Sequence, residues 1–288
     1  MCPKWLHPGN SAQAEFWNGQ VGHGWVDRQE IQDAILGPVD DSLFASASLQ
    51  PAERVIDVGC GCGATTIEFA RRVGPKGEVL GLDISAPMLE RARHRAPADL
   101  PLRFALADAT VYAFAPRAAD VVVSRFGIMF FADPVLAFSN LRRALRQDGR
   151  LAFVCWREAK FNPWMILPLR EALKHAPPLP EVGPEDPGPF AFADELRVRS
   201  ILDAAGYGDV GVTPHDIDLD IAMGRGLDNA VASTLMMGPT SRLLSDQGDA
   251  VRAAAASDIR AALVPYAYGK SVLLGTAIWL VTASNPKP

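Results

Sequence analysis

The sequence has little cysteine and no apolar run long enough to span a membrane. Its four cysteines are scattered over 288 residues, at Cys2, Cys60, Cys62 and Cys155. A disulfide framework needs more of them, so we expect reduced thiols in a cytoplasmic protein. The first ten residues lack the apolar core of a secretion signal. Residues 271–284 are apolar but fall short of the roughly 20 that a spanning helix needs, and they predict a buried strand.

The chain also lacks a strong excess of charge of either sign. Its formal net charge is −5, from 28 basic and 33 acidic residues. That balance does not favour a general nucleic-acid or membrane surface, and a small neutral or apolar partner fits better. The oligomeric state is not determined by these features, and a homodimer stays open.

From residue 54 onward, short β-branched runs alternate with stretches of helical spacing. This alternation is typical of repeated β-α units around a parallel sheet that is buried on both faces. We expect a helix from Pro134 that ends at Gly149. The expected strands of this region are 54–58, 78–84, 102–107, 120–124 and 151–156.

The second half predicts accessory helices and two further strands. Helices are expected over 161–173, 194–205 and 227–263, strands over 210–221 and 271–284, and a proline-rich loop over 176–192. The fold class is therefore α/β: a Rossmann-like doubly wound sheet, mostly parallel, with an antiparallel last strand. We predict an N-terminal helical cap (1–50), a core (51–221 and 270–288) and a helical lid (222–269).

The strongest motif joins the first strand to the helix that follows it. There Asp57 is followed by Gly59, Gly61 and Gly63 at alternate positions. Such glycines allow a tight turn and let a ligand touch the backbone. Asp83 ends the second strand, about 20 residues after Gly63, where an acidic side chain in such folds binds ribose hydroxyls.

Two cofactor classes contain a ribose and suit such a domain, namely dinucleotides and S-adenosylmethionine. Dinucleotide loops carry glycines in a G-x-G-x-x-G pattern, which the spacing here does not match. An acid at Asp57 would repel a pyrophosphate, but it suits a ligand that carries an ammonium and a cationic sulfur. The electrostatics favour S-adenosylmethionine.

With these motifs in order, the chain resembles the class I S-adenosylmethionine-dependent methyltransferases, similar to the ubiquinone and menaquinone C-methyltransferase group. The resemblance covers about residues 54–156 and implies methyl transfer to a small acceptor without a metal. It implies that the 57–63 loop, including Cys60, lines the methionine part and that Ile84 and Met88 contact adenine. Asp108 would accept the adenine amino group, Ala109 would face a ring nitrogen, and a carbonyl near Ser124 and Arg125 would face the ammonium.

Other interpretations carry less weight. The C-x-C spacing of Cys60 and Cys62 is not followed by a further Cys/His cluster, so we expect no metal site. The five histidines carry no motif, and no general base is assigned. An apolar acceptor pocket is predicted from Phe130, Trp156, Trp164 and Met236. The alternatives are an NAD-dependent oxidoreductase, for which no Tyr-x-x-x-Lys dyad is found, and a non-catalytic cofactor-binding relative. The acceptor atom, whether oxygen, nitrogen or carbon, stays open.

Overall fold

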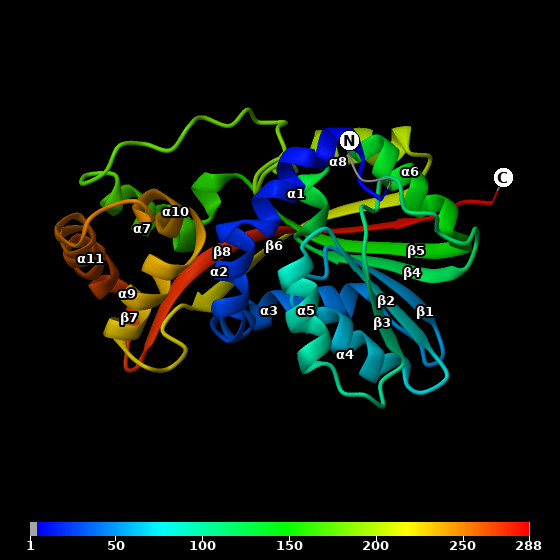
Figure 1. The fold of residues 1–288 in the computed structure, drawn as a ribbon, viewed down its shortest axis with the longest axis horizontal. Coiled ribbons are helices and arrows are strands. Elements are labelled where there is room, and N and C mark those ends of the chain that lie inside the picture. The colour runs from blue at the N-terminus through cyan, green and yellow to red at the C-terminus, as the bar shows by residue number, and fades with distance from the viewer. Residues whose placement is uncertain (1–4, 288) are drawn as a thin grey trace.

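The computed structural model describes residues 5–287, and its centre is one mixed sheet. The strand order is β3-β2-β1-β4-β5-β8-β6 (Figure 1). Strands β1 to β5 pair in parallel, β8 lies antiparallel between β5 and β6, and the short β7 pairs with β8. The predicted fold class is confirmed. The strands are β1 (Arg54–Val58), β2 (Glu78–Asp83), β3 (Leu102–Leu106), β4 (Ala119–Arg125), β5 (Leu145–Trp156), β6 (Gly208–Asp220), β7 (Ala267–Tyr268) and β8 (Ser271–Ser284).

The strand order indicates where a ligand would bind. The chain goes outward from β1 to β2 and β3, then returns to β4 on the other side of β1. Doubly wound sheets bind ligands at the carboxyl ends of the strands where the order reverses in this way. Val121, Val122 and Val123 of β4 are fully buried at the centre, as expected for a β-branched run that is covered on both faces.

Helices cover both faces of the sheet. In Figure 1, α3, α4 and α5 lie on one face, and α6 and α8 lie on the other. These helices are α3 (Gln29–Ala47), α4 (Ala64–Val73), α5 (Ala86–Arg95), α6 (Pro134–Ala144) and α8 (Glu195–Ala204). The N-terminal cap is therefore more than a cover for strand ends, because α3 packs on β4, β5, β6 and β8 through a buried apolar face.

One predicted boundary is wrong. The helix that begins at Pro134 ends at Ala144 rather than Gly149, and β5 begins at Leu145. Leu145 pairs with Ala119, and after an irregularity Arg150 pairs with Val121. Leu145 is completely buried although it belongs to β5. Its apolar side chain happens to fall at helical spacing after Leu141, which is why the sequence pattern placed it in the helix.

A second group of helices lies beyond the carboxyl ends of the parallel strands. β6 and β8 run past the end of β5 into this helical lobe (Figure 1). Helix α7, which we expected within the core, packs against α10 and α11 there. The lobe consists of α7 (Pro163–Ala172), α9 (Leu227–Met236), α10 (Gly238–Leu244), α11 (Asp249–Leu263) and η4 (Val264–Tyr266), and η3 (Ala159–Phe161) precedes it.

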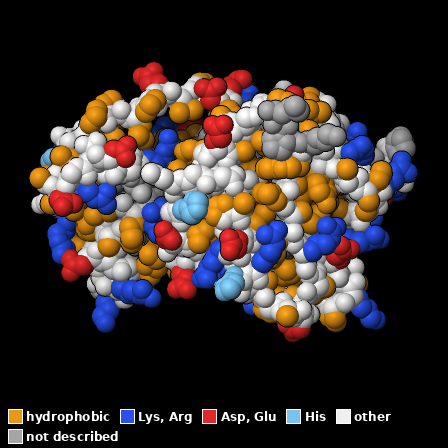
Figure 2. Space-filling model, viewed as in Figure 1, with side chains coloured by type: hydrophobic (Ala, Val, Ile, Leu, Met, Phe, Trp, Pro, Cys, Tyr) orange, Lys and Arg blue, Asp and Glu red, His pale blue; other side chains and the backbone are white. Residues whose placement is uncertain are grey.

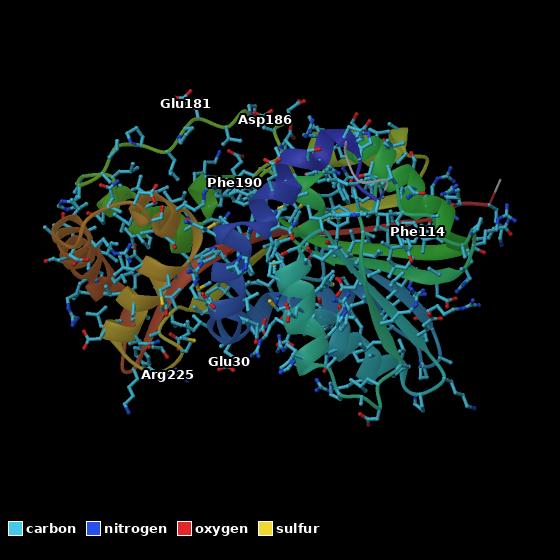
Figure 3. The ribbon with its side chains drawn as sticks, in the orientation of Figure 1. Glu30, Phe114, Glu181, Asp186, Phe190 and Arg225 are labelled. Atoms are coloured by element: carbon cyan, nitrogen blue, oxygen red, sulfur yellow. The ribbon has the colours of Figure 1, made fainter. Side chains whose placement is uncertain are left out.

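The remaining elements connect these parts. The N-terminal η1 (Pro8–Asn10), α1 (Ser11–Asn18) and α2 (Gln20–Asp27) lie between sheet and lobe, with α2 packed on α5 (Figure 1). The long loop that carries Glu181 and Asp186 arches over the molecule from α7 to α8 (Figure 3). Figure 2 shows acidic and basic side chains interspersed on one face. Within residues 5–287, none of the helices has the length and apolar character needed to cross a membrane.

Candidate functional site

The loop between β1 and α4 is built on three glycines in the left-handed region. Their φ angles are +68° at Gly59, +54° at Gly61 and +82° at Gly63. A Cβ on Gly59 would lie 2.5 Å from the Cα of Gly127, and one on Gly61 would lie 2.9 Å from the Met88 Cε. The loop therefore needs glycine both for its backbone angles and for its close approach to neighbouring segments.

Asp57 lies beneath this loop and is completely buried. Its Oδ2 accepts hydrogen bonds from Thr65 Oγ1 (2.7 Å) and Thr66 Oγ1 (2.6 Å). Its Oδ1 has no partner among residues 5–287. Burial raises the pKa of the Asp57 carboxyl to about 6, although the threonine hydrogen bonds and the charge of Arg125 oppose this. A buried oxygen without a partner is costly, so a ligand that donates to it would be favoured.

Asp83 ends β2, the strand beside β1, and is only partly buried. Its Oδ2 accepts from the Gly61 N–H and its Oδ1 accepts from the Ser85 N–H, both at 2.8 Å. Burial raises the pKa of Asp83, and these N–H donors act in the opposite direction. The carboxylate is thus fixed against the glycine loop, with further lone pairs open to a ligand.

Helix α1 holds the segment that follows Asp83. Asn18 donates to the Ile84 carbonyl (2.8 Å) and accepts from the Ala86 N–H (2.9 Å). Ile84 stays partly exposed, and Met88 is buried in the first turn of α5. The structure thus brings Ile84 and Met88 to the same corner as Gly61. No local pattern pointed to Asn18, because it lies 66 positions from Ile84.

Asp108 has partners that the sequence did not predict. Its Oδ2 accepts from the His7 N–H (2.9 Å) and from Asn10 Nδ2 (2.7 Å), and its Oδ1 accepts from the Thr110 N–H (2.8 Å). Only 1% of Asp108 is exposed. The carboxylate therefore ties the N-terminal segment to the end of β3, and an adenine role for Asp108 and the adjacent buried Ala109 stays a prediction.

Removing Asn10 should weaken this tie. Asn10 is buried, donates to Asp108 and accepts from the Ala132 N–H (2.8 Å), so Asn10→Ala takes one of the two donors from the buried Asp108 Oδ2 and the acceptor from the exposed Ala132 N–H. We expect the free energy of unfolding to fall by about 2 kcal/mol in urea titrations. Asn229→Ala, which loses one hydrogen bond to the Ala222 carbonyl, is the control and should cost about half as much. Equal losses of unfolding free energy in the two variants would contradict a structural role for the Asn10–Asp108 contact.

Three residues at and just after the end of β4 have distinct roles. Ser124 Oγ donates to the Val58 carbonyl (2.7 Å) and accepts from the Gly127 N–H (3.1 Å), which links β1 to β4. Arg125 donates to both oxygens of Asp40 at 2.8 Å, so α3 anchors it. Phe126 has a φ of +65°, which is strained for a bulky side chain, and its ring stacks on Trp156 with centroids 3.8 Å apart. Sequence reasoning missed Asp40 and the stacking of Phe126 on Trp156.

The residues predicted for the acceptor pocket are only partly brought together. Trp164 lines a cavity of about 10 Å³ between α3, α7, α9 and α10, with a ring centroid 5.5 Å from that of Trp156. Met237 rather than Met236 lines this cavity. Phe130 packs edge-on against Trp17 of α1 instead, with centroids 5.1 Å apart.

The cysteine pair in the glycine loop is not arranged for metal binding. Cys60 and Cys62 are buried, and burial raises the pKa of the Cys62 thiol to about 12 and that of Cys60 well above its usual value. Within the described part of the chain, no group of His, Cys, Asp or Glu side chains could hold a metal ion. Cys2 lies outside the described residues.

The chain is similar in sequence to proteins of one known family. A model of the family described as "Methyltransferase domain" matches residues 55–149. Nocamycin O-methyltransferase of Saccharothrix syringae is 30% identical over 194 residues, which are 63% of this chain and 69% of that protein. The chain belongs to the class I S-adenosylmethionine-dependent methyltransferases. The matched family domain contains the glycine loop, Asp83 and the end of β4.

Two further comparisons set the limits of this family assignment. The biotin biosynthesis bifunctional protein BioCD of Bordetella avium is 29% identical over 164 residues, which are 56% of this chain but only 33% of that protein. The chain thus spans about a third of that relative. Phosphoethanolamine N-methyltransferase 2 of Haemonchus contortus, solved with S-adenosyl-L-methionine, shares the fold, with a TM-score of 0.58, 16% identity and coverage of 99% of this chain and 62% of that one.

The residues at the β1 and β2 ends fit the family's cofactor. The buried Asp57 Oδ1 has no hydrogen-bond donor, and the ammonium of the cofactor would supply one. Because the loop residues Gly59, Gly61 and Gly63 have no side chains, a ligand could approach the loop backbone closely. Asp83 offers free lone pairs at the place expected for ribose hydroxyls. S-adenosylmethionine is the cofactor of this family, and nothing in the donor set of these residues conflicts with it.

Proposed function

We propose that the protein transfers a methyl group from S-adenosylmethionine to a small, largely apolar or aromatic acceptor by in-line displacement without a metal. The observation that carries this proposal is the pair of carboxylates at neighbouring strand ends, one of which has a buried oxygen without a partner. Asp57 and a carbonyl near Ser124 and Arg125 would bind the ammonium. Asp83 would bind the ribose hydroxyls.

The adenine ring of the cofactor would bind at the same corner of the fold. Ile84 and Met88 would pack on the adenine ring, while Asp108 Oδ1 and the Ala109 N–H would bind its polar edge. The bound cofactor supplies an electrophilic methyl group on a cationic sulfur. A dinucleotide is disfavoured, because the carboxylate of Asp57 under the loop would repel a pyrophosphate.

The chain's own contribution to the reaction would be alignment and exclusion of water. Helices α1 and α2 on one side and the lobe of α7, α9, α10 and α11 on the other lie around the carboxyl ends of β1 and β4 (Figure 1). Holding an acceptor in line with the methyl group removes much of the entropic part of the barrier. A dry site also strengthens the electrostatic contacts there.

Substitution of Asp83 tests the cofactor site. Asp83→Ala should weaken S-adenosylmethionine binding about 5- to 150-fold, corresponding to about 1–3 kcal/mol, because the ribose hydroxyls lose their acceptor. Calorimetry with S-adenosylmethionine, S-adenosylhomocysteine and NADH measures this and compares the cofactor classes. Asp99→Ala removes an exposed carboxylate between α5 and β3 and should leave binding unchanged. Unchanged affinity in Asp83→Ala, or tighter binding of NADH to the wild type, would count against the proposal.

Turnover needs a separate measurement. A panel of phenols, quinols, amines and carboxylates should be screened for release of S-adenosylhomocysteine. We expect release with neutral ring compounds. Cofactor binding without release from any panel member would favour a non-catalytic relative instead.

A further inference from the structure

The helical lobe contains a buried polar group that the cofactor site does not use. Trp164 of α7 is 9% exposed, and its indole Nε1 has no hydrogen-bond partner among the described residues. The same side chain lines the cavity of about 10 Å³ between α3, α7, α9 and α10. Leaving a buried N–H donor without an acceptor is unfavourable, and native proteins keep few such groups.

The cavity has neutral walls. Its apolar lining comes from the side chains of Ile35, Met165, Pro168, Ile221 and Met237, together with the Trp164 ring. Its remaining lining residues carry hydroxyls or are glycine and proline, and none of the lining residues is charged. A charged ligand would lose its hydration here without gaining an oppositely charged partner, so the cavity disfavours ions.

A row of aromatic rings connects this cavity to the glycine loop. Phe126 stacks on Trp156 with an interplanar angle of 15°, and Trp156 contacts Trp164. Phe126 directly precedes Gly127, whose Cα lies against Gly59 of the loop. Phe126 has a φ of +65°, a strained value for a bulky residue, and its ring is the first of this row. Flat rings stack favourably on such a surface.

From these observations we propose that the cavity is the binding site for the ring portion of a neutral acceptor. The indole N–H of Trp164 donates a hydrogen bond to a carbonyl or ether oxygen of that acceptor. This inference rests on the proposed methyl transfer and names its substrate class: neutral, ring-bearing compounds with a hydrogen-bond-accepting oxygen.

The occupied cavity has to be larger than the cavity seen here. About 10 Å³ is close to the space of one water molecule. Met237, Gly238 and Pro239 form one wall where α9 turns into α10. Gly238 has a φ of +63°, and a Cβ there would meet nothing within 4 Å. For a ring to enter, this turn, which no neighbour crowds at Gly238, has to move outward.

A matched pair of probes tests the hydrogen bond directly. 1-Tetralone and tetralin share a bicyclic ring system, and only the first carries a carbonyl oxygen. Their dissociation constants are measured by ligand-observed NMR with S-adenosylhomocysteine present. We expect the wild type to bind 1-tetralone about 5- to 10-fold more tightly than tetralin, the gain typical of one neutral hydrogen bond.

Two tryptophan variants separate the donor from the ring. Trp164→Phe keeps an aromatic ring but removes the N–H, so the preference for 1-tetralone should vanish while tetralin affinity is retained. Trp279→Phe is the control, because Trp279 Nε1 already donates to the Ala193 carbonyl at 2.8 Å and Trp279 does not line the cavity. It should behave as the wild type. Thermal unfolding verifies that both variants are folded.

The outcomes distinguish this inference from the proposed function. A preference that persists in Trp164→Phe, or a wild type that binds neither probe, overturns the cavity assignment even where S-adenosylmethionine binds normally. Loss of the preference in Trp164→Phe alone supports the assignment. Failure of S-adenosylmethionine to bind in calorimetry overturns methyl transfer independently of the probe results.

Discussion

Asp57→Asn should make the ligand-free protein gain stability relative to the wild type as the pH rises from 4 to 7. The folded-state pKa of Asp57 is about 6, above the value of 3.8 for a free aspartate. A carboxyl whose folded pKa is raised contributes stability below its unfolded pKa and loses that contribution as the pH rises through the folded pKa. A rise of this size in the pKa corresponds to a free-energy difference on the order of 3 kcal/mol.

The hydrogen-bond donors and charges around Asp57 explain why its pKa is not raised further. Thr65 and Thr66 donate to Oδ2 and Arg125 lies near, all of which favour the carboxylate, while Asp40 disfavours it. Denaturant titrations at several pH values measure the difference between wild type and variant. In the control Asp120→Asn the difference should stay nearly constant from pH 4 to 7 and change only below about pH 4, because the Arg54 N–H and Arg146 lower the pKa of Asp120 despite its partial burial. If the difference in unfolding free energy between wild type and Asp57→Asn did not change with pH, the raised pKa of Asp57 would be refuted.

The same substitution should weaken cofactor binding. We expect Asp57→Asn to reduce affinity for S-adenosylmethionine at pH 7.5 by about 10- to 100-fold, since an ammonium loses a partly buried charge partner. Wild-type affinity should also fall as the pH drops below about 6, and the variant should lack this dependence. Calorimetry over that pH range measures both effects. A wild-type affinity that is independent of pH would mean that Asp57 does not contact the ammonium.

Gly59→Ala should abolish measurable cofactor binding, a loss of at least about 100-fold. The added Cβ would lie 2.5 Å from the Gly127 Cα, which is backbone and cannot rotate away. The loop would therefore have to move away from the end of β4, taking its N–H groups out of position.

A second glycine supplies the matched control for this result. Gly74, after α4, has the same φ of +68°, but a Cβ there meets nothing within 4 Å. Gly74→Ala should lose about 1–3 kcal/mol of stability from backbone strain, because its ψ of −177° lies in a region that favours glycine, and should retain cofactor affinity. Calorimetry and thermal unfolding of both variants separate strain from steric conflict. Equal affinities in the two variants would show that the close approach to Gly127 is irrelevant to binding.

The sequence alone determined the strands, most helices and the glycine loop with its two carboxylates. These features are local: a β-branched run, a turn that needs left-handed glycines and an acid at a strand end each depend on neighbouring residues. The end of α6 was mispredicted for the same reason, since Leu145 is buried equally well from a strand.

Tertiary structure decided the contacts between distant segments. Asp108 binds His7 and Asn10 across about 100 positions, and Arg125 binds Asp40 across 85. The row of Phe126, Trp156 and Trp164 likewise exists only because α7 packs beside the end of β5. No local pattern encodes such pairs, because each depends on how helices far apart in the chain settle on one sheet.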